Sequence, residues 1–91
     1  MNRSEFLHHV EKNIKLMEKK HEDYQSEGVE LKDYFPFGSE SYVQMLHVKT
    51  TRLVSLVRKE ADPNYESIED TVRDLINYSV FYLDFLENMV E

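Results

Sequence analysis

The sequence has no cysteine and only two glycines and two prolines among its 91 residues. Without cysteine, the chain cannot build a disulfide scaffold, a thiolate zinc site or a cysteine nucleophile. With so few glycines, it has no glycine-rich phosphate loop. The helix-breaking residues fall in two short stretches, residues 28–38 and around Pro63. They therefore leave three long segments without interruption.

Basic residues are also scarce, with 11 Lys and Arg against 18 Asp and Glu. The formal net charge of −7 disfavours nonspecific binding to duplex DNA, because phosphate contacts need a positive surface. The longest apolar run, Leu75–Leu86, is too short and too interrupted to span a bilayer. The N-terminus does not have the pattern of a secretory signal. The composition therefore predicts a cytoplasmic protein (in the host cytoplasm if it is viral) with no membrane or duplex DNA partner.

Apolar residues recur every three or four positions in all three segments, which is typical of amphipathic helices. Ser4 precedes the first apolar residue and is the expected N-cap of the first helix. The run Ser67–Asp70 resembles a capping box near the start of the third helix. We predict an all-α fold, a single three-helix domain over residues 1–91 with helices at about residues 4–25, 40–60 and 65–90.

The apolar residues also predict which helix faces are buried. For the second helix we expect an inner stripe of Val43, Leu46, Thr50, Leu53 and Val57, which Met45, Val54 and Leu56 widen. For the third helix we expect a stripe of Ile68, Val72, Leu75, Ile76, Ser79, Leu83, Leu86 and Val90. Between Leu75 and Leu86 nearly the whole circumference is apolar, and one small subunit cannot enclose such a helix. We therefore predict a homo-oligomer, a dimer or larger, in which the apolar loop at 27–38 folds back or meets a second subunit.

Lys49 and Arg52 interrupt the most apolar part of the second helix and share one of its faces, because they are three residues apart. Burying either cation without a partner would be costly, so each needs an anion. That anion is either a carboxylate of the third helix or the phosphate of a ligand, and the sequence leaves both open.

Three acids of the third segment recur every four residues and so line one side of its first turns: Glu66, Asp70 and Asp74. Carboxylates placed in this way can hold Mg²⁺, a hard cation that also bridges to phosphate. The alternative is a favourable interaction with the helix dipole, which accounts for Asp70 better than for Asp74 because it fades within one turn. Asn77 and Tyr78 lie one turn further along.

A further polar group, Lys20-x-x-Asp23-Tyr24, ends the first helix. Taken in order with Lys49-x-x-Arg52-Leu53 and with the run from Arg73 to Tyr78 (Arg-Asp-Leu-Ile-Asn-Tyr), it resembles the nucleotide-modification-associated domain. This small family is common in bacteriophages and is similar to the all-α nucleotide pyrophosphohydrolases of the MazG and dimeric dUTPase type. The likeness covers roughly residues 19–86.

The resemblance implies a helical oligomer that acts on nucleotides with the help of Mg²⁺. By position, Lys49 and Arg52 would contact phosphate. The metal ligands, and the catalytic groups of an enzyme, would be Glu66, Asp70 and Asp74. The remaining nucleotide-binding residues would be Lys20, Tyr24, Asn77 and Tyr78, with Tyr24 stacking on a base.

Three functions stay open at this stage. The first is a nucleotide-binding protein that sequesters a nucleotide or cyclic nucleotide, and the second is a Mg²⁺-dependent (d)NTP pyrophosphohydrolase. The third is a non-catalytic oligomerisation adaptor. Hydrolases of the similar families carry a run of glutamates in the helix that precedes the acidic element, whereas here that helix offers only Glu40. This difference favours binding over hydrolysis.

Overall fold

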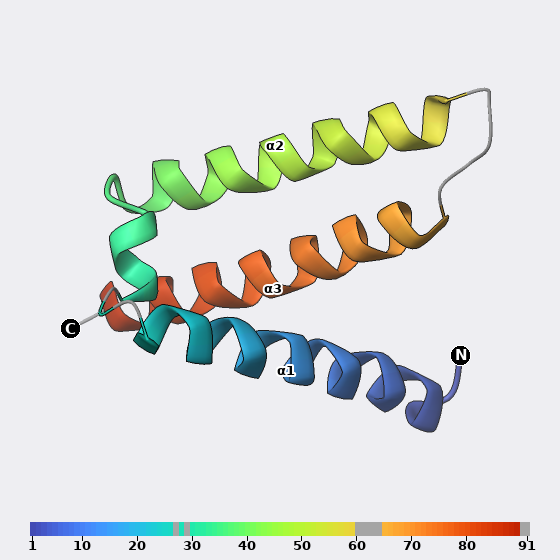
Figure 1. Cartoon of the computed structure of the whole chain (residues 1–91), viewed down its shortest axis with the longest axis horizontal. Helices are drawn as coiled ribbons and strands as arrows, with labels where there is room; N and C mark the ends of the chain where they lie inside the picture. The colour runs from blue at the N-terminus through green and yellow to red at the C-terminus, as the bar shows by residue number, and fades with distance from the viewer. Residues whose placement is uncertain (27, 29, 60–64, 90–91) are drawn as a thin grey trace. The chain divides into compact units, whose positions relative to one another are not determined.

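The computed structural model consists of three α-helices and one short 3-10 helix (Figure 1). It describes residues 1–26, 28, 30–59 and 65–89. The elements in chain order are α1 (Arg3–Ser26), η1 (Leu31–Tyr34), α2 (Ser39–Arg58) and α3 (Tyr65–Met89). No strand occurs in these residues, which confirms the all-α prediction. The observed helix ends also lie within about two residues of the predicted ones.

The chain divides by its internal contacts into two units, Met1–Pro36 and Phe37–Glu91. The second unit is a helical hairpin in which α2 and α3 lie side by side and run antiparallel (Figure 1). Aromatic rings join the start of α2 to the end of α3. The Tyr42 ring stacks on Tyr82 with a centroid distance of 5.3 Å and an interplanar angle of 12°, and it lies 5.1 Å from Phe85.

Gly38 sets the entry into α2. It is the N-cap residue, and its backbone angles of φ 62° and ψ −134° lie in a region that L side chains rarely adopt. A Cβ atom there would also lie 3.2 Å from Cζ of Phe85. The Ser41 hydroxyl accepts a hydrogen bond of 2.8 Å from the backbone N–H of Phe37, which fixes this turn. The helix thus begins at Ser39, close to the expected start.

The buried faces of α2 and α3 match the predicted stripes only in part. On α2, after the serines of its first turn, the partly or fully buried side chains are Tyr42, Met45, Leu46, Lys49, Leu53 and Leu56. Val43, Thr50 and Val57 were expected inside but are exposed, with Val57 at 63%. The observed face shares Met45, Leu46, Leu53 and Leu56 with the prediction, and it adds Tyr42 and Lys49, which the prediction left out.

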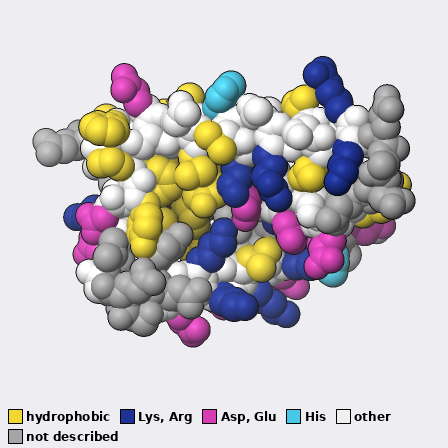
Figure 2. Space-filling view, turned by 45° about the horizontal axis from the view of Figure 1, so that its top comes forward, with side chains coloured by type: hydrophobic (Ala, Val, Ile, Leu, Met, Phe, Trp, Pro, Cys, Tyr) yellow, Lys and Arg dark blue, Asp and Glu magenta, His cyan; other side chains and the backbone are white. Residues whose placement is uncertain are grey.

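On α3 most of the predicted stripe is exposed, while Ile68 and Leu75 are partly buried and Val90 lies outside the described residues. Val72, Ile76, Leu83 and Leu86 are 40%, 43%, 64% and 38% exposed. The face toward α2 is instead built from Thr71, Asp74, Leu75, Tyr78, Tyr82 and Phe85. Figure 2 shows hydrophobic side chains lying open at the surface among basic and acidic ones. Among the residues described, the only apolar side chains below 9% exposure are Phe35 and Tyr42.

The first unit contains α1, which begins one residue before the expected cap. The Asn2 side-chain oxygen accepts a 2.9 Å hydrogen bond from the Glu5 N–H, and the Glu5 carboxylate accepts one of 3.2 Å from the Asn2 N–H. This reciprocal pair satisfies two backbone donors at the helix start, as a capping box does. The prediction of Ser4 as N-cap is therefore wrong, because Asn2 performs that role. Ser67 likewise lies inside α3, which begins at Tyr65.

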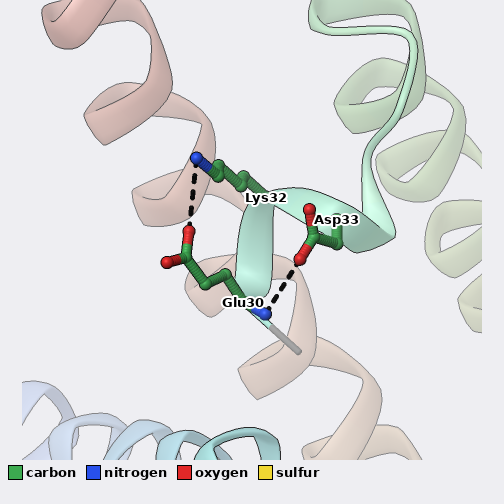
Figure 3. A network of polar contacts seen from close by, with 3 residues as sticks. All are labelled: Glu30, Lys32 and Asp33. Carbon is green, nitrogen blue, oxygen red and sulfur yellow. Dashed lines mark hydrogen bonds and ion pairs between the residues drawn. The ribbon is translucent and has the colours of Figure 1, made fainter. Parts of the chain in front are cut away.

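The predicted loop at 27–38 contains η1. The Glu30 N–H donates a 3.0 Å hydrogen bond to the Asp33 carboxylate, and Lys32 Nζ lies 3.3 Å from Glu30 Oε2 (Figure 3). Both side chains of the ion pair are over 70% exposed, so the pair adds little stability. The aromatic residues that follow differ in exposure, since Phe35 is buried and Phe37 is 78% exposed.

None of the described helices combines the length and the apolar character needed to cross a bilayer.

Candidate functional site

Lys49 lies on the inner face of α2, between the apolar Leu46 and Leu53. Its Nζ is 3.0 Å from Oδ2 of Asp74 on α3. The side chains are 23% and 25% exposed, respectively, so the pair is neither sealed in a dry core nor fully solvated. The structure therefore brings together two of the predicted site residues, one from each helix of the hairpin.

Tyr78 adds an aromatic ring to this pair. Lys49 Nζ lies 5.9 Å from the centroid of the Tyr78 ring, within the range of a cation–π interaction. Tyr78 follows Asp74 by four residues, so the two side chains share a face of α3. Its ring packs edge-on against Phe81 with centroids 5.8 Å apart, which restricts its orientation. Lys49, Asp74 and Tyr78 thus form one contiguous group, called here the charged group.

Arg52 lies one turn along α2 from Lys49 and is exposed. Within the described ranges the Arg52 guanidinium makes no ion pair. The hairpin therefore presents a second cation, open to solvent, beside the charged group.

The three acids predicted to line one side of α3, Glu66, Asp70 and Asp74, do not share one environment. Asp74 is paired with Lys49, whereas Glu66 and Asp70 are exposed on the first turns of α3. Across residues 1–26, 28, 30–59 and 65–89, no three His, Asp or Glu side chains are grouped closely enough to hold a metal ion. The donor set of the described residues thus does not fit a Mg²⁺ site in this arrangement.

Asn77 and Arg73 are buried side chains of α3, each 5% exposed. The Arg73 guanidinium lies 3.6 Å from Glu69, one turn earlier on the same helix. Nδ2 of Asn77 has no hydrogen-bond partner among the residues that the structure describes. A buried donor without a partner costs about 1–3 kcal/mol of folding free energy, so apolar packing alone does not account for an asparagine at position 77. The sequence predicted Asn77 as a site residue, and its contact with a ligand stays a prediction.

Lys20 and Tyr24, the other predicted nucleotide contacts, belong to α1 in the first unit. Lys20 is half-buried. The side chain of Tyr24 lies outside the described part of the structure. Their roles therefore stay predictions.

Two surface hollows along α2 are lined by other residues. One of about 560 Å³ is bordered by Ser39, Glu40, Val43, Gln44 and His47. A smaller one of about 210 Å³ is bordered by Leu53, Val54, Val57 and Arg58. Neither hollow is lined by Lys49, Asp74 or Tyr78, so the charged group is not part of either of them.

The aromatic cluster of Tyr42, Tyr82 and Phe85 was missed by the sequence reasoning. The pKa of the Tyr42 phenol is raised above its ordinary value of 10.0, first by burial and second by the negative charge of Asp84. A usable signal was present, since Tyr42, Leu46, Lys49 and Leu53 follow a spacing of four, three and four residues. That spacing defines the inner face of α2 once polar-tipped residues are allowed on it.

Comparison with curated proteins and with solved structures gives no match to this chain. A protein-family model, described as nucleotide modification associated domain 1, matches residues 20–84. This range is more than two thirds of the chain and contains η1, α2 and most of α3, including the whole charged group and Arg52. The chain therefore belongs to the nucleotide modification associated domain 1 family.

Proposed function

We propose that this protein binds a phosphate-bearing nucleotide at the charged group and Arg52, and that it does so without a metal ion. The observation that carries the proposal is the Lys49–Asp74 pair, a half-buried ion pair on the facing surfaces of two helices. The membership in a nucleotide-associated family supports the choice of a nucleotide over other anions.

Asp74 acts in this proposal as an internal counter-ion that is exchanged for the ligand. A partly exposed ion pair contributes only about 0–1 kcal/mol, so the lysine can be released at little cost. A nucleotide phosphate carries more negative charge and more acceptor oxygens than one carboxylate. It can therefore bind Lys49 and Arg52 together, because these cations lie one turn apart on α2.

Tyr78 provides the apolar part of the binding surface. Its ring is held by Phe81 and already lies near a cation, as its 5.9 Å distance to Lys49 shows. Nucleobases stack on such rings with about 1–3 kcal/mol per base. The base would stack on Tyr78 while the phosphates occupy the positions next to Lys49 and Arg52.

The alternative of a Mg²⁺-dependent pyrophosphohydrolase requires carboxylates that converge on a metal. The described carboxylates of α3 do not converge, since Asp74 is engaged by Lys49 while Glu66 and Asp70 are exposed. We therefore propose capture of the nucleotide without turnover, a sequestering role, and derive no catalytic step.

A thermal-shift screen tests the proposal with the common ribo- and deoxynucleoside mono- and triphosphates and with cyclic dinucleotides, all in EDTA. At 100 times its Kd a ligand adds about 2.7 kcal/mol of stability. Arg52→Gln should remove the shift. Arg58→Gln is the matched control, because it removes an exposed arginine from the last turn of the same helix. No shift with any nucleotide, or equal shifts for the two variants and the wild type, would contradict the proposal.

A further inference from the structure

Lys59 is a third cation in line with Lys49 and Arg52. It follows Arg52 by seven residues, which is about two helical turns, so the two side chains leave the helix within about 20° of each other. Lys59 is the C-cap residue of α2, and its φ of −65° is still helical, so its Cα–Cβ bond keeps the direction that the helix gives it. The three cations therefore lie within about a quarter of the circumference of α2.

The three cations are spaced unevenly along the helix axis. Lys49 and Arg52 are about 5 Å apart along the axis, whereas Arg52 and Lys59 are about 10 Å apart. Because the side chains of a helix all lean toward its N-terminus, their charged ends keep about the same separation. Lys49 and Arg52 are thus placed to hold one phosphate together, and Lys59 is placed for a second anionic group further along.

Lys59 and Arg52 are both exposed, and neither makes an ion pair within the part of the chain that the structure describes. Figure 2 shows basic side chains recurring along one face of the molecule, with acidic ones beside them. Arg58 differs, because it lies about 120° around the helix from Arg52 and borders the hollow next to Val57. A cation in the last turn favours the helix dipole at either position, so the dipole does not account for the alignment of Lys59 with Arg52.

We propose that Lys59 binds a second phosphate of the ligand, and that the ligand is a nucleotide whose two phosphates are separated by a nucleoside. The assignment rests on the proposed function, because the first phosphate is the one held at Lys49 and Arg52. In a di- or triphosphate chain, neighbouring phosphates share a bridging oxygen, so the negative charge is concentrated in one short stretch. In a dinucleotide a ribose separates the phosphates, which fits the gap between Arg52 and Lys59 better. Linear and cyclic dinucleotides share this chemistry.

Calorimetric titration in EDTA tests the ligand class. The probes are cyclic di-AMP, the linear dinucleotide pApA, AMP and ATP, and the matching guanine series, with ATP as the control for total negative charge. In one series, at least one dinucleotide should bind at least about five-fold more tightly than the mono- and the triphosphate, and the tighter of the two dinucleotides identifies the source. Triphosphates that bind as tightly as the dinucleotides would overturn this assignment and leave the proposed function standing. No binding of any nucleotide would overturn both.

Lys59→Gln tests the residue. It should weaken binding of the preferred dinucleotide about five-fold and leave the affinity for the mononucleotide within about two-fold, because the mononucleotide has no second phosphate. Arg58→Gln is the matched control, since it removes the neighbouring exposed cation that lies out of line, and it should change neither affinity. Arg52→Gln should weaken both ligands, because Arg52 holds the first phosphate. An equal loss for both ligands in Lys59→Gln, or no loss for either, would overturn the assignment of Lys59.

Discussion

Two stretches of the same helix pair differ in what they place between α2 and α3. At one end, Tyr42 stacks on Tyr82, packs at a tilt against Phe85 and is only 4% exposed. In the middle, the corresponding position of α2 is Lys49, which meets Asp74 with both side chains about a quarter exposed. The positions are seven residues apart, so they occupy equivalent places on the helix.

The difference separates contacts that stabilise the hairpin from charged side chains that we propose bind a ligand. The aromatic end buries large apolar rings and needs no ligand to be favourable. The charged group gives up apolar packing for an ion pair, and an ion pair in a partly wet position returns little free energy. We therefore assign most of the hairpin's stability to the aromatic end and the proposed nucleotide binding to the charged group.

The largest expected effect is at the aromatic end. Tyr42→Ala should lower the free energy of unfolding by about 3 kcal/mol, because it removes the ring that packs against both Tyr82 and Phe85. Urea denaturation followed by circular dichroism measures it. Tyr65→Ala is the control at a 76% exposed tyrosine and should change stability by less than about 0.5 kcal/mol. Equal effects of the two substitutions would show that the aromatic end is not the main source of the hairpin's stability.

Gly38→Ala tests the stability of the aromatic end through the backbone turn that leads into α2. The new Cβ would lie 3.2 Å from the Phe85 ring, in a backbone conformation that alanine rarely adopts. We expect a loss of about 2 kcal/mol in the same denaturation experiment. Gly28→Ala also has a positive φ but meets nothing within 4 Å, so its loss should be smaller. If Gly28→Ala costs as much, contact with Phe85 is not part of the effect.

Lys49→Met should separate stability from binding. Methionine retains most of the stem that packs between the helices, so the free energy of unfolding should change by less than about 1 kcal/mol. Nucleotide binding, measured by calorimetric titration, should fall below detection. A large loss of stability with retained binding would reverse the roles given to the two stretches.

The smallest effect is on the pH dependence. The folded state raises the pKa of Tyr42 above 10.0 through burial and Asp84, so it holds the phenol proton to higher pH than the unfolded chain does. The resulting stability is complete below pH 10 and is lost as the pH rises through the folded-state pKa. Tyr42→Phe should therefore flatten the decline of stability above pH 10. Tyr65→Phe, at an exposed position, should keep the decline of the wild type.

The sequence predicted the helices well and their contact faces poorly. Helix ends follow from local signals, such as the scarce glycines and prolines around residues 28–38 and 63, and these signals do not depend on packing. Contact faces depend on which of several apolar stripes finds a partner. In α3 the stripe through Val72 and Leu83 has the stronger apolar periodicity, yet α2 packs against the face of Asp74 and Tyr78.

The candidate site was predicted in part for a related reason. Spacing alone placed Lys49 and Arg52 on one side of α2 and placed Asp74 and Tyr78 on one side of α3, and the hairpin brings Lys49, Asp74 and Tyr78 together. The metal site predicted from Glu66, Asp70 and Asp74 was not found, because a regular spacing of carboxylates does not determine which of them a neighbouring lysine will engage. That choice depends on the register of two helices, which the sequence of either helix does not contain.

The affinity of Asp74→Asn for the tightest-binding nucleotide, measured by calorimetric titration with and without Mg²⁺, tests the central claim most directly. If Asp74 is an internal counter-ion that the phosphate replaces, its neutralisation should strengthen binding about two- to five-fold, and Mg²⁺ should make no difference. Loss of binding in Asp74→Asn, or wild-type binding that occurs only with Mg²⁺, would show that the carboxylate holds the ligand or its metal and would contradict the account.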